Sequence, residues 1–231
     1  DLSQEKGLFA LQGPRSRKIL QESFDYDLSE LPFHSFTDIT RGGLDLTVAT
    51  TGYTGEPGCE ILFDRDKAHE VWRRLSASKP PFCPALIGFG ARDTLRLEAG
   101  CLLYGNDMDE TVTPLDVGLG WVVKFGAADF IGKEALLRYQ KKGIERRLIG
   151  FALIDKGVAR HGYDIFAGSR RVGRVTSGSY CPTIAQSAGF GLVENGSVRT
   201  GDIIRVQMRK RMLDARVIDR PCYRRDKNEP L

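Results

Sequence analysis

Residues 44–63 read LDLTVATTGYTGEPGCEILF, two apolar runs on either side of a loop rich in glycine. Before the loop, apolar and polar residues alternate from Leu44 to Ala49. After it, the run from Cys59 to Phe63 is apolar except for Glu60. This pattern predicts two strands joined by a glycine-rich turn.

Segments on both sides of this pair have the spacing of helices. Apolar residues recur at helical intervals, Pro14 suits the first helical position, and Gly100 suits the residue that follows a helix. The predicted helices cover residues 15–24, 68–75, 91–99 and 133–143. Helices mixed with strands in this order predict an α+β layer rather than a doubly wound sheet.

From about Arg146 the sequence pattern changes to short apolar runs separated by glycine. The predicted strands cover residues 148–153, 163–167, 172–176, 189–193, 203–208 and 215–218. Short strands at this spacing predict a small antiparallel β-barrel. We therefore expect two domains, residues 1–143 and 144–231, with the boundary near Gly143.

Composition excludes several classes of protein. The chain has 231 residues, 41% of them apolar and 28% charged, which is ordinary for a globular protein. No apolar run approaches the roughly 18 to 20 residues that span a bilayer, so no membrane is expected. The net charge of +4 comes without a nucleic-acid-binding motif and suits a small anion or an acidic protein partner better than nucleic acid. Five cysteines without CxxC spacing and three separated histidines predict neither a metal site nor a disulfide framework.

Two clusters of polar residues are candidates for chemistry. The loop that starts at Thr51 is neither a dinucleotide fingerprint nor a P-loop, so phosphate binding is disfavoured. A structural turn is its commoner interpretation. The alternative is that Glu60 accepts two parallel hydrogen bonds from an amidine-like edge. On the helix 91–99, Arg92 and Arg96 share a face, either paired with neighbouring acids or with Arg92 directed at an anionic or carbonyl-bearing ligand.

A third segment, residues 106–110, resembles the beginning of a calcium loop. Such a loop needs a bidentate glutamate at its twelfth position, and Val117 stands there. The sequence therefore predicts a turn rather than a calcium site.

Nine short motifs occur together and in order: LQGP (11–14), TGYTGE (51–56), RDTLRLEAG (92–100), LYGND (103–107), TPL (113–115), GLGW (118–121), FIGK (130–133), RHGY (160–163) and TSG (176–178). Through these nine motifs the chain resembles the aminomethyltransferase (T-protein) family of the glycine cleavage system over nearly its whole length. The resemblance implies a ferredoxin-like α/β portion followed by a small C-terminal antiparallel β-barrel.

The resemblance also implies a reaction. In it, an aminomethyl group held on the lipoyl arm of H-protein passes to tetrahydrofolate, with release of ammonia. The family's folate-binding glutamate matches Glu60, its arginine matches Arg92, and a tyrosine of the folate pocket matches Tyr53. Arg224 matches a basic ligand position near the C-terminus. The implied partners are tetrahydrofolate and lipoylated H-protein.

The family's catalytic aspartate belongs to an N-terminal segment that this chain lacks, so the catalytic residue stays unassigned, and Asp93 is not a substitute for it. We expect this chain alone to be weakly active or inactive. The alternative functions are a non-catalytic folate-binding module and the folate-binding part of a dimethylglycine or sarcosine dehydrogenase. The wording of residues 103–107 is closer to eukaryotic members, which implies a mitochondrial matrix location, or the cytoplasm if the protein is bacterial.

Overall fold

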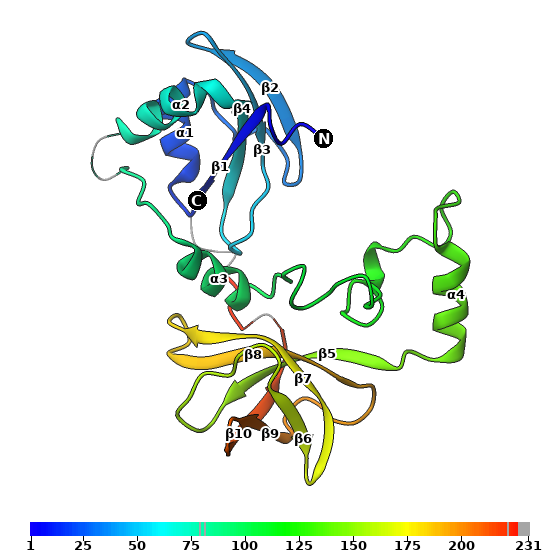
Figure 1. The fold of residues 1–231 in the computed structure, drawn as a ribbon. Coiled ribbons are helices and arrows are strands. Elements are labelled where there is room, and N and C mark those ends of the chain that lie inside the picture. The colour runs from blue at the N-terminus through cyan, green and yellow to red at the C-terminus, as the bar shows by residue number, and fades with distance from the viewer. Residues whose placement is uncertain (79, 81, 221, 226–231) are drawn as a thin grey trace. The chain divides into compact units, whose positions relative to one another are not determined.

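The computed structural model describes residues 1–78, 80, 82–220 and 222–225. The chain forms two compact units. Of the described residues, the first comprises those from Asp1 to Arg92 together with Arg225, and the second comprises those from Asp93 to Arg224 (Figure 1).

The first unit is a four-stranded antiparallel sheet with two helices against one face (Figure 1). Its elements are β1 (Lys6–Gln12), α1 (Ser16–Phe24), β2 (Phe36–Arg41), β3 (Leu44–Ala49), β4 (Gly58–Asp64), a 3₁₀ turn (Arg65–Lys67) and α2 (Ala68–Ser76). The strand order is β1-β4-β3-β2.

The core of this unit lies between the sheet and the helices. Strands β3 and β4 contribute Leu44, Leu46, Val48, Cys59, Ile61 and Phe63 to it. Successive strand residues point to opposite faces of a sheet, so Glu60 and Leu62 lie on the face away from this core.

The second unit contains a closed six-stranded antiparallel barrel. Helix α3 (Phe89–Glu98) crosses the boundary between the units. A 3₁₀ turn (Gly120–Val122), α4 (Lys133–Lys142) and the strands β5 (Arg146–Leu153), β6 (Asp164–Ala167), β7 (Arg170–Cys181), β8 (Gln186–Glu194), β9 (Ile203–Met208) and β10 (Arg211–Ile218) follow it. The barrel order is β10-β5-β8-β7-β6-β9. Strands β7 and β8 approach so closely that a Cβ on Gly173 would lie 2.2 Å from the carbonyl oxygen of Leu192.

The α+β class, the predicted helices and the barrel are confirmed, and each predicted strand lies within or overlaps an observed one. The sequence did not predict β1 and β2, which form the edges of the sheet. Strand β2 reads FTDITR and buries only Ile39, so it has too little apolar alternation to be recognised. The predicted boundary at Gly143 falls between α4 and β5, inside the second unit, and the division into 1–143 and 144–231 stays a prediction. Across the described residues, every helix is too short or too polar to cross a membrane.

Candidate functional site

The loop between β3 and β4 is held by one side chain, that of Gln12 at the end of β1. Its Nε2 donates to the main-chain oxygens of Thr51 and Cys59, each at 3.1 Å, one on either side of the loop. Its Oε1 accepts from the hydroxyl of Thr54 at 3.4 Å. These hydrogen bonds fix both ends and the middle of the loop.

Two glycines leave the space that this glutamine occupies. A Cβ on Gly52 would lie 2.1 Å from Gln12 Oε1, and one on Gly58 would lie 2.3 Å from the same atom. Real Cβ atoms do not approach so closely, so a side chain at either position would displace Gln12. Close packing against Gln12 thus explains why glycine stands at positions 52 and 58. This agrees with the interpretation of the loop as a structural turn. Gly55 has φ of +75°, which glycine adopts readily.

Glu60 projects from β4 beside small residues. Its cross-strand neighbours are Ala10 on β1 and Ala49 on β3, and its own side chain is half-buried. The hydroxyl of Thr51 donates a short hydrogen bond to its Oε2. Two open hollows of the first unit, of about 540 and 480 Å³, are lined by residues other than Glu60. The half-buried carboxylate lies on the face of the sheet opposite the core.

Tyr53 and Arg92 are in contact. The guanidinium carbon of Arg92 lies 4.7 Å from the centroid of the Tyr53 ring, within the range of a cation–π interaction. Arg92 is exposed on the first turns of α3, and Tyr53 is half-buried in the β3–β4 loop. The structure thus brings together two of the residues that the sequence predicted for one site.

Arg224 belongs to the second unit and is exposed. The residue before it is fixed, because the amide of Tyr223 donates to the carbonyl oxygen of Glu98 at 2.9 Å. The Glu98 carboxylate in turn accepts from the amide and the hydroxyl of Thr183, at 3.0 and 2.5 Å. These bonds anchor the C-terminal segment within its own unit, and the role of Arg224 as a folate ligand stays a prediction.

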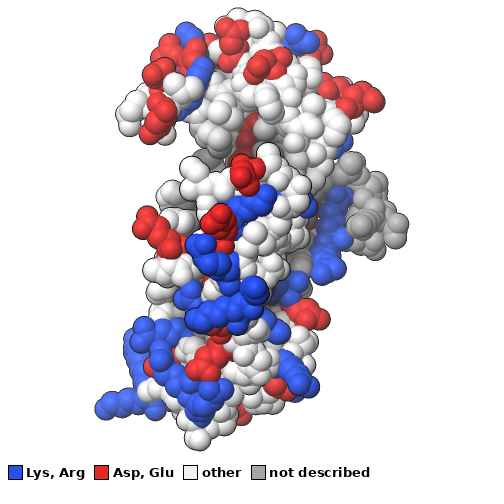
Figure 2. Space-filling view, turned by 90° about the vertical axis from the view of Figure 1, so that its right-hand side faces the viewer, with Lys and Arg blue, Asp and Glu red and all other residues white. Residues whose placement is uncertain are grey.

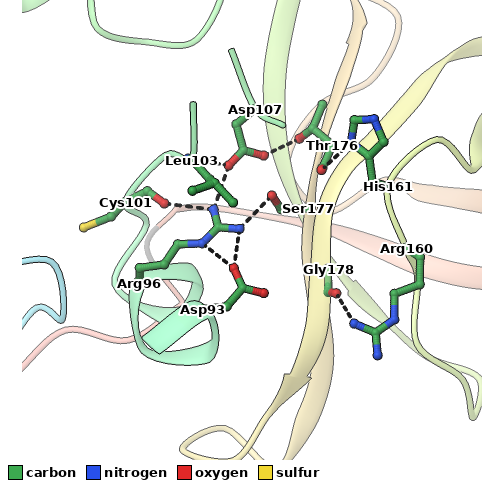
Figure 3. A network of polar contacts seen from close by, with 10 residues as sticks. All are labelled: Asp93, Arg96, Cys101, Leu103, Asp107, Arg160, His161, Thr176, Ser177 and Gly178. Atoms are coloured by element: carbon green, nitrogen blue, oxygen red, sulfur yellow. Dashed lines mark hydrogen bonds and ion pairs between the residues drawn. The ribbon is translucent and has the colours of Figure 1, made fainter. Parts of the chain in front are cut away.

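Arg96 has a different environment from Arg92, one helical turn before it. Its side chain is 1% exposed and donates to Asp93, to Asp107 and to Ser177 at 2.7 to 2.9 Å (Figure 3). Burial by itself lowers the pKa of Arg96, but the hydrogen bonds to the two carboxylates outweigh it and raise the pKa. The paired interpretation of this helix is therefore correct for Arg96, which supports the fold of the second unit.

The contacts of Arg96 also show how Asp93 and Asp107 are used. Asp93 forms an ion pair with Arg96 at 2.7 Å. Asp107 accepts from Arg96, from the amide of Leu103 at 2.9 Å and from the hydroxyl of Thr176 at 2.6 Å. Its oxygens are thus used for structure. Within the described parts of the chain, no group of three His, Cys, Asp or Glu side chains is arranged to hold a metal ion.

The buried cysteines do not supply a nucleophile. Burial raises the pKa of Cys59 to about 12, with a further contribution from the neighbouring Glu60. Burial likewise raises the pKa of Cys181 to about 12. Both remain protonated thiols at neutral pH, and thiols are poor nucleophiles.

Sequence reasoning did not identify three residues that shape the loop. Gln12 and Thr51 lie inside quoted motifs, but no local pattern assigns them a hydrogen-bond partner. Arg225 forms an ion pair with Glu56 of the loop at 3.8 Å, and the two side chains are 14% and 18% exposed. Arg225 was not among the residues that the sequence predicted for the site.

Comparison with known proteins places the chain in a family. The family described as GCVT N-terminal domain matches residues 1–127, and the glycine cleavage T-protein C-terminal barrel domain matches residues 146–224. An aminomethyltransferase of Thermosipho melanesiensis is 46% identical over 96% of this chain and 60% of its own length. One of Halothermothrix orenii is 45% identical over 95% of this chain and 61% of its own length. The crystal structure of glycine cleavage system aminomethyltransferase T from Bartonella henselae superposes with a TM-score of 0.86 at 29% identity, covering 94% of this chain and 60% of that one.

The chain spans about 60% of the length of these relatives. They are bacterial, so they do not support the expected mitochondrial location. The two family matches follow one another along the sequence: the first includes the whole four-stranded sheet, and the second covers the barrel strands. The chain belongs to the glycine cleavage T-protein family.

Proposed function

We propose that this chain acts as an aminomethyltransferase of the glycine cleavage system, or as the folate-binding and barrel parts of one. The reaction transfers the aminomethyl unit from the lipoyl arm of H-protein to tetrahydrofolate and releases ammonia. The observation that carries the proposal is the arrangement of Glu60, Tyr53 and Arg92 around one loop held by Gln12. The named relatives support it.

The chemistry of Glu60 fits the pterin ring of a folate. A pterin presents a ring N–H and an exocyclic amine side by side, and one carboxylate can accept both in parallel. Each carboxylate oxygen has two acceptor positions, so the bond from Thr51 to Oε2 leaves capacity for two more donors. The flanking Ala10 and Ala49 are too small to cover the carboxylate.

Tyr53 and Arg92 supply complementary contacts. The Tyr53 ring offers an apolar face with a polar tip, and its contact with Arg92 limits the freedom of both side chains. Arg92 keeps its positive charge at any physiological pH, which suits a carbonyl or carboxylate of the ligand. Tetrahydrofolate supplies the nitrogen that accepts the one-carbon unit, and these residues would orient it. Positioning of this kind accounts for a large share of many rate enhancements.

The charge of the barrel supports an acidic protein partner such as H-protein. From Arg146 onward basic residues outnumber acidic ones, whereas acidic residues are in excess before it. Figure 2 shows Lys and Arg side chains gathered over the barrel. Opposite charge on a partner would speed its encounter with this surface. The bacterial relatives favour the cytoplasm over the mitochondrial matrix.

The test is calorimetric titration of tetrahydrofolate into the chain and into its Glu60→Ala variant. Loss of a charge-assisted hydrogen-bonded pair is expected to cost about 1.5 to 3 kcal/mol, which weakens binding at least about tenfold. Equal affinity of the two proteins would contradict the assignment of the pterin to Glu60. An aminomethyl-transfer assay with lipoylated H-protein then separates an enzyme from a folate-binding module of the dehydrogenase type.

A further inference from the structure

The carboxylate of Glu60 is oriented by a neighbouring hydroxyl. The last torsion of a glutamate side chain is broad, so a free carboxylate turns over a wide range. Among the residues that the structure describes, Thr51 is the hydrogen-bond donor to Glu60, and it binds Oε2. This contact restricts the rotation of the carboxylate.

The position of Thr51 depends on Gln12. The Gln12 carboxamide binds the main-chain oxygen of Thr51 and that of Cys59, the residue before Glu60. One side chain from β1 therefore fixes both the donor and the strand that carries the acceptor. Gly52 and Gly58 leave the room for it.

From this chain of contacts we infer that Thr51 and Gln12 are positioning residues for the pterin site. Gln12 sets the backbone of the loop, and Thr51 holds the Glu60 carboxylate in the plane that two parallel N–H donors require. The inference rests on the proposed folate binding and names the residues that prepare the site before the ligand arrives. Preorganisation of this kind strengthens binding because the ordering cost is met in the free protein.

The experiment compares matched threonine variants. Thr51→Val keeps the shape of the side chain and removes the hydroxyl, and Thr51→Ser keeps the hydroxyl. Thr47→Val is the control, because Thr47 lies on β3 and donates to a different carboxylate, Asp38, at 2.5 Å. Each variant is titrated with tetrahydrofolate under reducing conditions, and its melting temperature is measured alongside.

We expect Thr51→Val to raise the Kd for tetrahydrofolate about tenfold, which is the effect of roughly one lost hydrogen bond. Thr51→Ser and Thr47→Val should stay within about twofold of the unchanged chain. Gln12→Met, which removes the carboxamide at similar length, should weaken binding in the same direction. A purely structural role would lower the melting temperature and leave the Kd of the folded protein unchanged.

A double-mutant cycle tests whether Thr51 acts through Glu60. In the Glu60→Ala background the carboxylate is gone, so Thr51→Val should have no further effect on Kd. Equal effects of Thr51→Val in both backgrounds, or wild-type affinity in Thr51→Val, would overturn the inference while leaving the proposed function intact. Absence of tetrahydrofolate binding by the unchanged, folded chain would overturn the proposed function and this inference with it.

Discussion

Replacing Asp107 with alanine tests the buried ion pair of the second unit. The Asp107 side chain is 0% exposed and accepts hydrogen bonds from Arg96 at 2.7 Å, from the amide of Leu103 and from the hydroxyl of Thr176. The substitution leaves all three donors without this acceptor. The Arg96 guanidinium stays buried with Asp93 as its remaining carboxylate partner.

The expected loss follows from burial. Breaking a buried ion pair by removing one partner costs about 3 to 5 kcal/mol, because the other charge stays buried without compensation. Asp93→Ala is the matched control. Asp93 binds the same guanidinium at 2.7 Å, but its side chain is 45% exposed. Water can therefore take its place while Asp107 keeps the buried charge paired, so we expect a loss of about 1 kcal/mol. The two variants should therefore differ by at least about 2 kcal/mol.

Native-state hydrogen exchange measures this difference in stability within the second unit. The amides of β7 next to Thr176 report the local opening free energy, independently of unfolding in the other unit. A difference of about 2 kcal/mol corresponds to roughly 30-fold faster exchange in Asp107→Ala than in Asp93→Ala. If both variants exchange at the same rate, burial does not determine the contribution of this carboxylate, and the reasoning fails.

Two further outcomes are expected in the second unit. Gly173→Ala places a methyl group against the Leu192 carbonyl, which is backbone and cannot rotate away, so we expect a loss of about 1 to 3 kcal/mol by urea denaturation. Gly126→Ala meets no atom within 4 Å and should be near neutral in the same assay. The hydrogen bond from Arg171 lowers the pKa of Asp164. A lowered pKa in the folded state contributes stability above the unfolded pKa and loses it as the pH falls through the folded pKa. Melting temperatures at low salt should therefore fall less steeply across the acidic range in Asp164→Asn, and an unchanged slope would contradict this.

Local patterns were sufficient for the parts of the fold whose residues alternate or recur regularly. Helix α2 buries Val71 and Leu75 one turn apart, as its sequence predicts. The edge strand β2 was missed, since it pairs on one side only and buries a single apolar residue, Ile39. Its hydrogen bonds come from β3, which no property of the segment itself reveals.

Some residues of the candidate site could likewise be predicted from the sequence, and others could not. The resemblance to the family predicted Glu60, Tyr53 and Arg92 as site residues, and the structure brings the last two into contact. The supports of the site, Gln12 and Thr51, stayed hidden because their partners are set by strand pairing. Gln12 meets a loop 39 residues away in sequence, and neither end of that contact has a periodic signal.

Helix α3 shows why spacing alone could not separate structural from functional charge. Arg92 and Arg96 lie one turn apart, and a helical wheel gives them the same face. Arg96 is buried because Asp107 and Ser177 come to it from residues far along the chain, and this burial uses its charge for stability. Arg92 has an aromatic ring as its contact and remains exposed, so its charge stays available to a ligand. Arg96 thus anchors the helix, whereas the binding role of Arg92 stays a prediction. Tertiary contacts, rather than helical spacing, therefore distinguish the two arginines.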